Sequence, residues 1–111
     1  MESIMPTDRD TCYVCGCYLE SWNRNEHHIF YGTANRKVSE REGLKVYLCR
    51  ECHTQGRYSV HRNPNKGADK TLKMDAQTLW EQRYINAHPN EENAEKAARE
   101  AFRTLFGRSY L

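Results

Sequence analysis

Residues 44–53, LKVYLCRECH, combine a strand pattern with a metal-binding motif. The first five residues alternate between apolar and polar and end in an apolar pair, which is typical of a half-buried β-strand. Cys49 and Cys52 follow with two residues between them, and this spacing lets two thiolates bind one edge of a tetrahedral ion. The segment therefore predicts a short strand that leads directly into a metal site.

A second pair with the same spacing, Cys12 and Cys15, lies near the start of the chain. Gly16 follows it and suits a tight turn, because the backbone amides must fold over the sulfurs there. Two such pairs complete a tetrahedral sphere and leave no open position for chemistry, so we predict a structural zinc site. A redox dithiol is the alternative, although one pair would suffice for it and no thioredoxin-like βαβ pattern is present. Cys17 is left over and is expected to be a buried or half-buried thiol.

The composition explains why this chain would need a metal for stability. It has 111 residues, of which 38% are apolar, and its mean hydropathy is −0.98. Leu, Ile, Val and Phe together number only 17, so the apolar core is small. The sequence contains no run of about 20 apolar residues and no signal-peptide pattern in residues 1–10. We therefore expect a cytoplasmic location without membrane contact, where cysteines bind metal rather than form disulfides.

The pattern along the chain predicts an α+β domain with short strands first and helices last. Strands are expected at residues 27–31 and 44–48, separated by a charged loop at 33–43. Residues 49–55 are expected to form a short helix or turn, followed by a loop at 56–67.

The last third of the chain predicts two helices. Apolar residues recur at helical spacing after Asp75, a capping residue, and Pro89 ends this pattern. The second helix is expected to begin at Asn90 and to end at Gly107. The single domain, residues 1–111, then has three parts: 1–26 with the zinc cysteines, 27–67 with the strands, and 68–111 with the helices. Four large aromatic residues are expected to fill the core: Trp22, Trp80, Phe102 and Phe106.

The net charge of +2 conceals an uneven distribution. Residues 27–74 carry ten Lys and Arg against four Asp and Glu, which gives +6, whereas residues 1–26 and 75–111 sum to −3 and −1. Such a basic segment is usually a solvated surface. It also contains four of the five histidines, which makes nucleic acid a candidate partner.

The histidines form the second signal. His27 and His28 are adjacent in the first predicted strand, so their side chains point to opposite faces and do not easily bind one ion. His53 follows Cys52 directly, and His61 lies eight residues further on. Eight residues of unbroken helix climb about 12 Å, so the chain must turn back near Gly56 for His61 to join His53 at one metal ion.

The segments EHHI at residues 26–29 and LCRECH at residues 48–53 resemble the HNH endonuclease pattern with flanking zinc cysteines. Residues 27–37, HHIFYGTANRK, and the ending at 102–111, FRTLFGRSYL, are similar to phage and prophage proteins related to the Ref-like, recombinase-dependent nucleases. The resemblance implies a ββα-metal (His-Me finger) fold with a C-terminal helical extension. It also implies that His27 and His53 bind a catalytic divalent ion and that His28 is the general base.

Two departures from the family pattern modify this expectation. Arg57 stands where the family has its next helix ligand and cannot bind a metal, so His61 is assigned as the third ligand. The bracing Asn of the family would fall at Leu44, and Asn35 is the candidate to brace His28 instead. Three basic residues are candidate contacts to DNA phosphates: Arg36, Lys37 and Arg57.

The sequence therefore predicts an HNH-type endonuclease that hydrolyses DNA. Its expected cofactors are a structural Zn²⁺ and a catalytic divalent ion, which is Mg²⁺, Mn²⁺, Ni²⁺ or Zn²⁺. DNA is the expected partner, and a recombinase filament or another phage DNA-processing protein is a further one, with the protein itself a monomer or a dimer. The alternative is a non-catalytic zinc-knuckle module that binds DNA or a protein.

Overall fold

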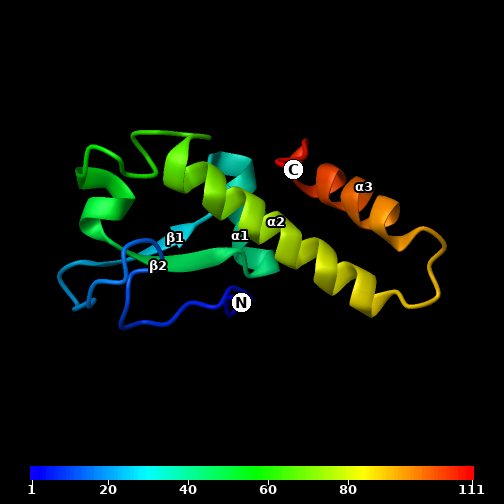
Figure 1. Ribbon diagram of the computed structural model, residues 1–111, viewed down its shortest axis with the longest axis horizontal. Helices are drawn as coiled ribbons and strands as arrows, with labels where there is room; N and C mark the ends of the chain where they lie inside the picture. Colours follow the sequence, from blue (N-terminus) through cyan, green and yellow to red (C-terminus); the bar gives the residue numbers. More distant parts are fainter.

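The computed structural model describes residues 1–111 and confirms a small α+β domain with a two-stranded sheet and helices, although one helix lies between the two strands (Figure 1). The molecule is elongated and measures 46 × 23 × 22 Å along its principal axes. None of its helices combines the length and the apolar character needed to cross a membrane. The elements in chain order are β1 (Arg24–His28), α1 (Thr33–Glu42), β2 (Lys45–Cys49), the π-helical turn η1 (Glu51–Gln55), α2 (Gly67–Ala87) and α3 (Ala94–Phe106).

The two strands pair in antiparallel fashion, with His27 opposite Val46 and Arg24 opposite Cys49. Val46 and Leu48 are buried, as the alternating pattern of this segment predicts. β1 begins and ends three residues earlier than predicted, because the chain after His28 leaves the sheet toward α1. The sheet therefore ends at His28 and Lys45, which are paired.

Residues 33–42 form the helix α1 and not the predicted loop. The segment contains neither Gly nor Pro, and most of its side chains face water, so a strong apolar stripe is not needed for it to be helical. Gly43 adopts a left-handed conformation with φ 72° and donates to the carbonyl oxygens of the last turn. The buried Ser39 hydroxyl donates to the carbonyl oxygen of Phe30 at 2.7 Å and thereby fixes the connection between β1 and α1.

The helix α2 begins at Gly67, eight residues before the predicted cap at Asp75, which lies in its middle. The first turns of α2, residues 67–74, were not predicted to be helical. Their buried face carries polar residues, so apolar residues do not recur there at helical spacing. In these turns Asp69 is paired with Lys73 at 2.8 Å, and further along the helix the buried Glu81 is paired with Arg99 at 2.8 Å. The helix ends at Ala87, two residues before Pro89, as predicted.

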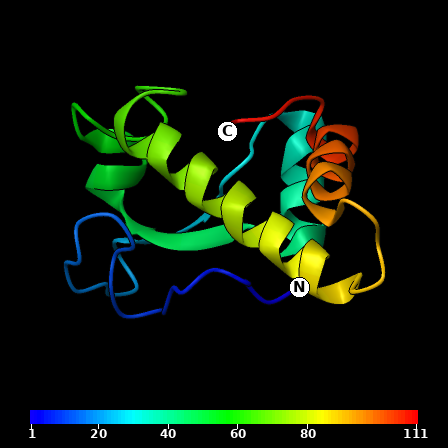
Figure 2. The ribbon, with the colours of Figure 1, turned by 45° about the vertical axis from the view of Figure 1, so that its right-hand side comes forward.

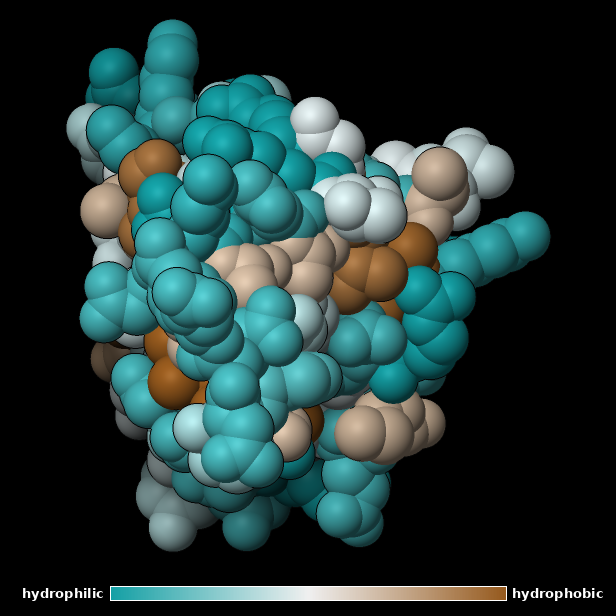
Figure 3. Space-filling model, turned by 90° about the vertical axis from the view of Figure 1, so that its right-hand side faces the viewer, coloured by the Kyte–Doolittle hydropathy of each residue, from teal (hydrophilic) through white to brown (hydrophobic).

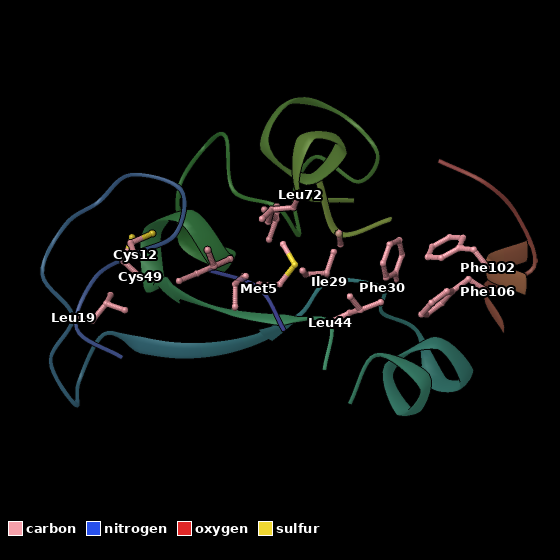
Figure 4. Close-up of a cluster of buried hydrophobic side chains, with 14 residues drawn as sticks. Met5, Cys12, Leu19, Ile29, Phe30, Leu44, Cys49, Leu72, Phe102 and Phe106 are labelled. Carbon is pink, nitrogen blue, oxygen red and sulfur yellow. The ribbon is translucent and has the colours of Figure 1, made fainter. Parts of the chain in front are cut away.

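The helix α3 begins at Ala94, four residues after the predicted start at Asn90, and ends at Phe106, where Gly107 caps it with a φ of 81°. It packs beside α1 and against α2 (Figure 2). Its buried Phe102 and Phe106 meet Phe30, with ring centroids 5.4 and 4.5 Å apart. Figure 4 shows these rings at one end of the core and Cys12 with Cys49 at the other. The core is thus a narrow row of side chains that runs from the metal-binding cysteines to α3.

The prediction that all four large aromatic residues fill the core is correct for Phe102 and Phe106 and wrong for Trp22, whose exposed fraction is 65%. Trp22 lies on the turn before β1, where its indole N–H donates to Glu20 at 2.9 Å and the guanidinium of Arg50 lies 5.4 Å from its ring centroid. Trp80 is partly buried against the core. The end of the molecule formed by α2 and α3 is mostly hydrophilic, with small apolar patches between charged side chains (Figure 3).

Candidate metal centres

The four predicted zinc cysteines lie together where the N-terminal loop meets the end of β2. Their sulfur atoms are all within 4.8 Å of one another. The sulfurs of Cys15 and Cys49 are 3.8 Å apart. Zn–S bonds of about 2.3 Å place tetrahedral sulfurs about 3.8 Å apart, so the geometry fits one zinc ion. The group of Cys12, Cys15, Cys49 and Cys52 can therefore hold a structural metal ion such as zinc.

Backbone amides support the sulfurs as the spacing predicts. The N–H of Cys15 points to the sulfur of Cys12 at 3.5 Å, and the N–H of Cys52 points to the sulfur of Cys49 at 3.4 Å. Burial of the Cys15 thiol opposes its ionisation, but the backbone N–H of Cys17 and the neighbouring thiols outweigh it, and the pKa of Cys15 falls to about 7. Cys17 itself is exposed and not buried as predicted, and its thiol borders those of Cys15 and Cys49 from the solvent side.

The predicted histidine ligands form a second group. His27 projects from β1, His53 from η1, and His61 from the loop before α2, and their ring nitrogens lie within 4.8 Å of one another. The Nε2 atoms of His53 and His61 are 3.1 Å apart. Metal–nitrogen bonds of 2.0–2.1 Å separate tetrahedral nitrogens by about 3.4 Å, so these rings already face one common point.

The buried side of this group is unsatisfied without a ligand. The His27 side chain is almost wholly buried, and its Nε2 has no hydrogen-bond partner. Burial lowers the pKa of His27 to about 3 and that of His53 to about 4, so both rings are neutral at pH 7 and keep a lone pair for a ligand. A buried, unpaired nitrogen is costly, and a bound metal ion would satisfy it. These residues therefore fit a divalent ion.

The chain turns back before His61, as the eight-residue spacing requires. Gly56 ends η1, and a Cβ there would lie 2.6 Å from the carbonyl oxygen of Glu51. The N–H of Val60 then donates to the carbonyl oxygen of Cys52 at 2.9 Å, and the N–H of His61 donates to that of His53 at 3.2 Å. These two hydrogen bonds hold the returning loop segment against η1, which places His61 beside His53.

Asn25 is a site residue that the sequence analysis missed. It lies two residues before His27 on the same face of β1, and its Oδ1 is 2.8 Å from Nδ1 of His53. Because an amide oxygen only accepts hydrogen bonds, His53 must carry its proton on Nδ1, and Nε2 is left free toward His61. The two residues are 28 positions apart in the sequence, so this contact is visible only in the folded protein.

Replacing Asn25 with Ala is expected to weaken divalent metal binding at the three histidines by about 10- to 100-fold, because His53 loses the group that sets its tautomer and orientation. Asn25→Asp retains an acceptor oxygen and should bind more tightly than Asn25→Ala. Titration of the zinc-loaded protein with Co²⁺, followed by its visible absorption, measures both affinities. Equal affinities for wild type and Asn25→Ala would show that Asn25 does not orient His53.

His28, the predicted base, lies apart from the three histidines. Its Nε2 is 3.7 Å from a carboxylate oxygen of Glu40, and the ammonium of Lys45 binds the same carboxylate at 2.7 Å. Adjacent strand residues point to opposite faces, so this separation from His27 follows from the strand itself. Asn35, which was predicted to brace His28, forms no hydrogen bond with it. Because residues 33–42 are helical, Glu40 and not Asn35 lies beside the His28 ring.

The remaining predicted contacts are distributed around the domain. Arg36 and Lys37 are exposed on α1, and Arg57 is exposed on the loop after η1. A further set of residues that the sequence did not reveal lies behind His61. The ring of Tyr31 packs 4.7 Å from that of His61, and its hydroxyl donates to the buried Asp69 at 3.2 Å. α2 thereby supports the histidine group through one aromatic ring.

The two groups share one short segment of the chain, since Cys52 belongs to the first group and His53 to the second. Residues 49–53 thus join a site closed by four sulfurs to a group of three nitrogens that leaves further positions open to a ligand. No protein-family model, curated protein or solved structure matches this chain.

Proposed function

We propose that this protein is a metal-dependent HNH-type endonuclease that hydrolyses phosphodiester bonds of DNA, encoded by a phage or prophage and linked to recombination or DNA processing. The observation that carries the proposal is the convergence of His27, His53 and His61 beside the four cysteines. A ββα-metal fold would use β1, β2 and η1 as its core, with α2 and α3 as the extension.

The proposed residues have separate roles. His27, His53 and His61 would hold one divalent ion, which supplies charge stabilisation to the phosphate and to the leaving 3′ oxygen. Asn25 orients His53, and Tyr31 packs against His61. The four cysteines hold the structural zinc and fix η1, so that the histidines are positioned before DNA binds.

His28 remains the proposed general base. A neutral imidazole nitrogen can accept a proton from water, and a carboxylate oxygen of Glu40 lies 3.7 Å from the Nε2 atom of His28. The same contact also supports the alternative function. In a non-catalytic zinc-knuckle module that binds DNA or a protein, His28, Glu40 and Lys45 are simply an ion-pair network at the end of the sheet.

A supercoiled plasmid assay with Mg²⁺, Mn²⁺, Ni²⁺ or Zn²⁺ tests the proposal. We expect nicked or linear DNA with at least one of these ions. His28→Ala should lower the cleavage rate by about 10²- to 10⁴-fold, the contribution typical of a general base, while the metal content and the melting temperature stay unchanged. His88→Ala is the matched control, because His88 is exposed at the end of α2.

Each outcome assigns a function. Cleavage that survives in His28→Ala would exclude this residue as the base and would assign it to the ion-pair network. An uncut plasmid with all four ions, on double-stranded and on single-stranded DNA, would contradict the endonuclease proposal and favour the binding module.

A further inference from the structure

A cleft opens at the end of the molecule that carries the metal centres. It has a volume of about 530 Å³ and lies between the N-terminal loop, the loop after η1 and the start of α2. Val14, Tyr58 and Lys66 line it from these three segments. In Figure 1 the N-terminal loop (blue) and the η1 segment (green) lie at this same end. Cys52, one of the four cysteines, also lines the cleft, so the cleft borders the proposed zinc site.

Tyr58 presents an unusually exposed ring on a rigid loop. Its exposed fraction is 78%, although its neighbours Ser59 and Val60 are almost completely buried. The side chain of Asn63 donates to the carbonyl oxygens of Arg57 and Ser59, on both sides of Tyr58, at 3.0 and 2.9 Å. The backbone is therefore fixed while the ring has no packing partner in the core. A fixed, exposed aromatic ring is a surface on which another flat group can stack.

The charge around the cleft identifies the chemistry of that group. The guanidinium of Arg57 lies 5.6 Å from the ring centroid of Tyr58, and Lys66 also lines the cleft. One carboxylate, that of Glu51, also lines the cleft. Over residues 50–73 there are six Lys and Arg against two Asp and Glu, and the buried Asp69 is already paired with Lys73. A stacking ring with neighbouring cations is complementary to a base and its flanking phosphates.

The cleft is also close to the histidine group along the chain. His61 lies only three residues after Tyr58. Three residues span at most about 10 Å, so a nucleotide at Tyr58 and a phosphate at the histidines belong to one short stretch of strand. A base within a duplex is stacked on both faces and paired, and it cannot offer a face to Tyr58 without leaving the stack.

We propose that this cleft binds single-stranded DNA, with one unpaired base stacked on Tyr58 and adjacent phosphates bound by Arg57 and Lys66. The inference rests on the proposed action on DNA and narrows its substrate to unpaired strands. It gives Arg57 a role in a defined site, together with a tyrosine that the sequence analysis did not single out.

Fluorescence anisotropy with a labelled thymidine oligonucleotide tests the proposal, using the zinc-loaded protein without added divalent ion. Wild type is expected to bind the single strand more tightly than a duplex of the same length. Tyr58→Ala should weaken single-strand binding by about 5- to 150-fold, the range that stacking on one aromatic ring supplies, and should leave duplex binding unchanged. Tyr58→Phe keeps the ring and should restore binding. Tyr18→Ala is the matched control, because Tyr18 is 81% exposed but does not line the cleft.

The outcomes separate this proposal from the endonuclease proposal. Equal single-strand affinity for wild type and Tyr58→Ala, an equal loss in Tyr18→Ala, or a preference for duplex would overturn the cleft assignment, even if plasmid is cut. If neither the single strand nor the duplex bound, the cleft assignment would be overturned as well, and a protein partner would be favoured. Binding that depends on Tyr58 without any cleavage would support the cleft and contradict the endonuclease.

Discussion

Cys49→Ser is expected to cause the largest loss of stability of any single substitution in this protein. Structural zinc sites bind with about 10–16 kcal/mol, whereas the whole stability of a small domain is about 5–15 kcal/mol. Removing one of four thiolates should therefore leave the N-terminal loop and η1 without their main connection. Cys49 also ends β2 and is 5% exposed within the core, so its loss should reach the sheet.

Two measurements on purified protein check this expectation. Metal analysis should show that the tightly held zinc is lost, and thermal unfolding followed by circular dichroism should lose its cooperative transition or shift to a much lower temperature. Cys17→Ser is the matched control, because Cys17 is an exposed cysteine outside the group of four. Its zinc content and melting temperature should match those of wild type.

The alternative dithiol interpretation makes the opposite prediction. If the cysteine pairs were redox centres, Cys49→Ser would keep a folded protein with an unchanged melting temperature under reducing conditions. A strong chelator would likewise have no effect on the far-ultraviolet spectrum. Either result would contradict a structural zinc site, since the small apolar core would then be sufficient to hold the fold.

Local spacing explains why the grouping of the four cysteines and of the three histidines could be predicted from the sequence. The spacing within each C-x-x-C pair already places its two thiolates side by side. Only the contact between the two pairs depends on the fold. The position of His61 followed from helix length, because eight residues climb too far unless the chain reverses. These features depend on short segments and were therefore visible without the fold.

The features that were missed depend on polar residues whose burial only the fold shows. α1 was expected to be a loop because its charged side chains hide a helix that buries little beyond Ser39. The first turns of α2 were missed because Asp69 and Lys73 are buried as a pair. Asn25 was missed because its contact with His53 crosses 28 residues of sequence. Each of these polar groups is satisfied by a distant partner, which no periodic pattern reports.

His27→Ala is expected to have the largest effect on the proposed endonuclease activity. Charge stabilisation of a phosphoryl group by a metal ion contributes several kcal/mol, and each 1.36 kcal/mol corresponds to a tenfold change in rate. Losing the buried ligand should therefore slow plasmid cleavage by about 10³-fold or more. The exchangeable divalent ion should be lost, whereas the zinc of the four cysteines should remain, because the two groups share no ligand.

The result must be separated from a failure to fold, since His27 is 1% exposed and packs inside the domain. His61→Ala serves this purpose, because His61 is exposed and its removal leaves no buried cavity. Loss of the exchangeable ion and of cleavage in both variants, at an unchanged melting temperature for His61→Ala, would support the three-histidine site. Full cleavage in His61→Ala with the ion retained would exclude His61 as a ligand. That result would leave His27 and His53 as the remaining ligands of the three-histidine group. Arg57 could not replace His61, because a guanidinium does not bind a metal ion.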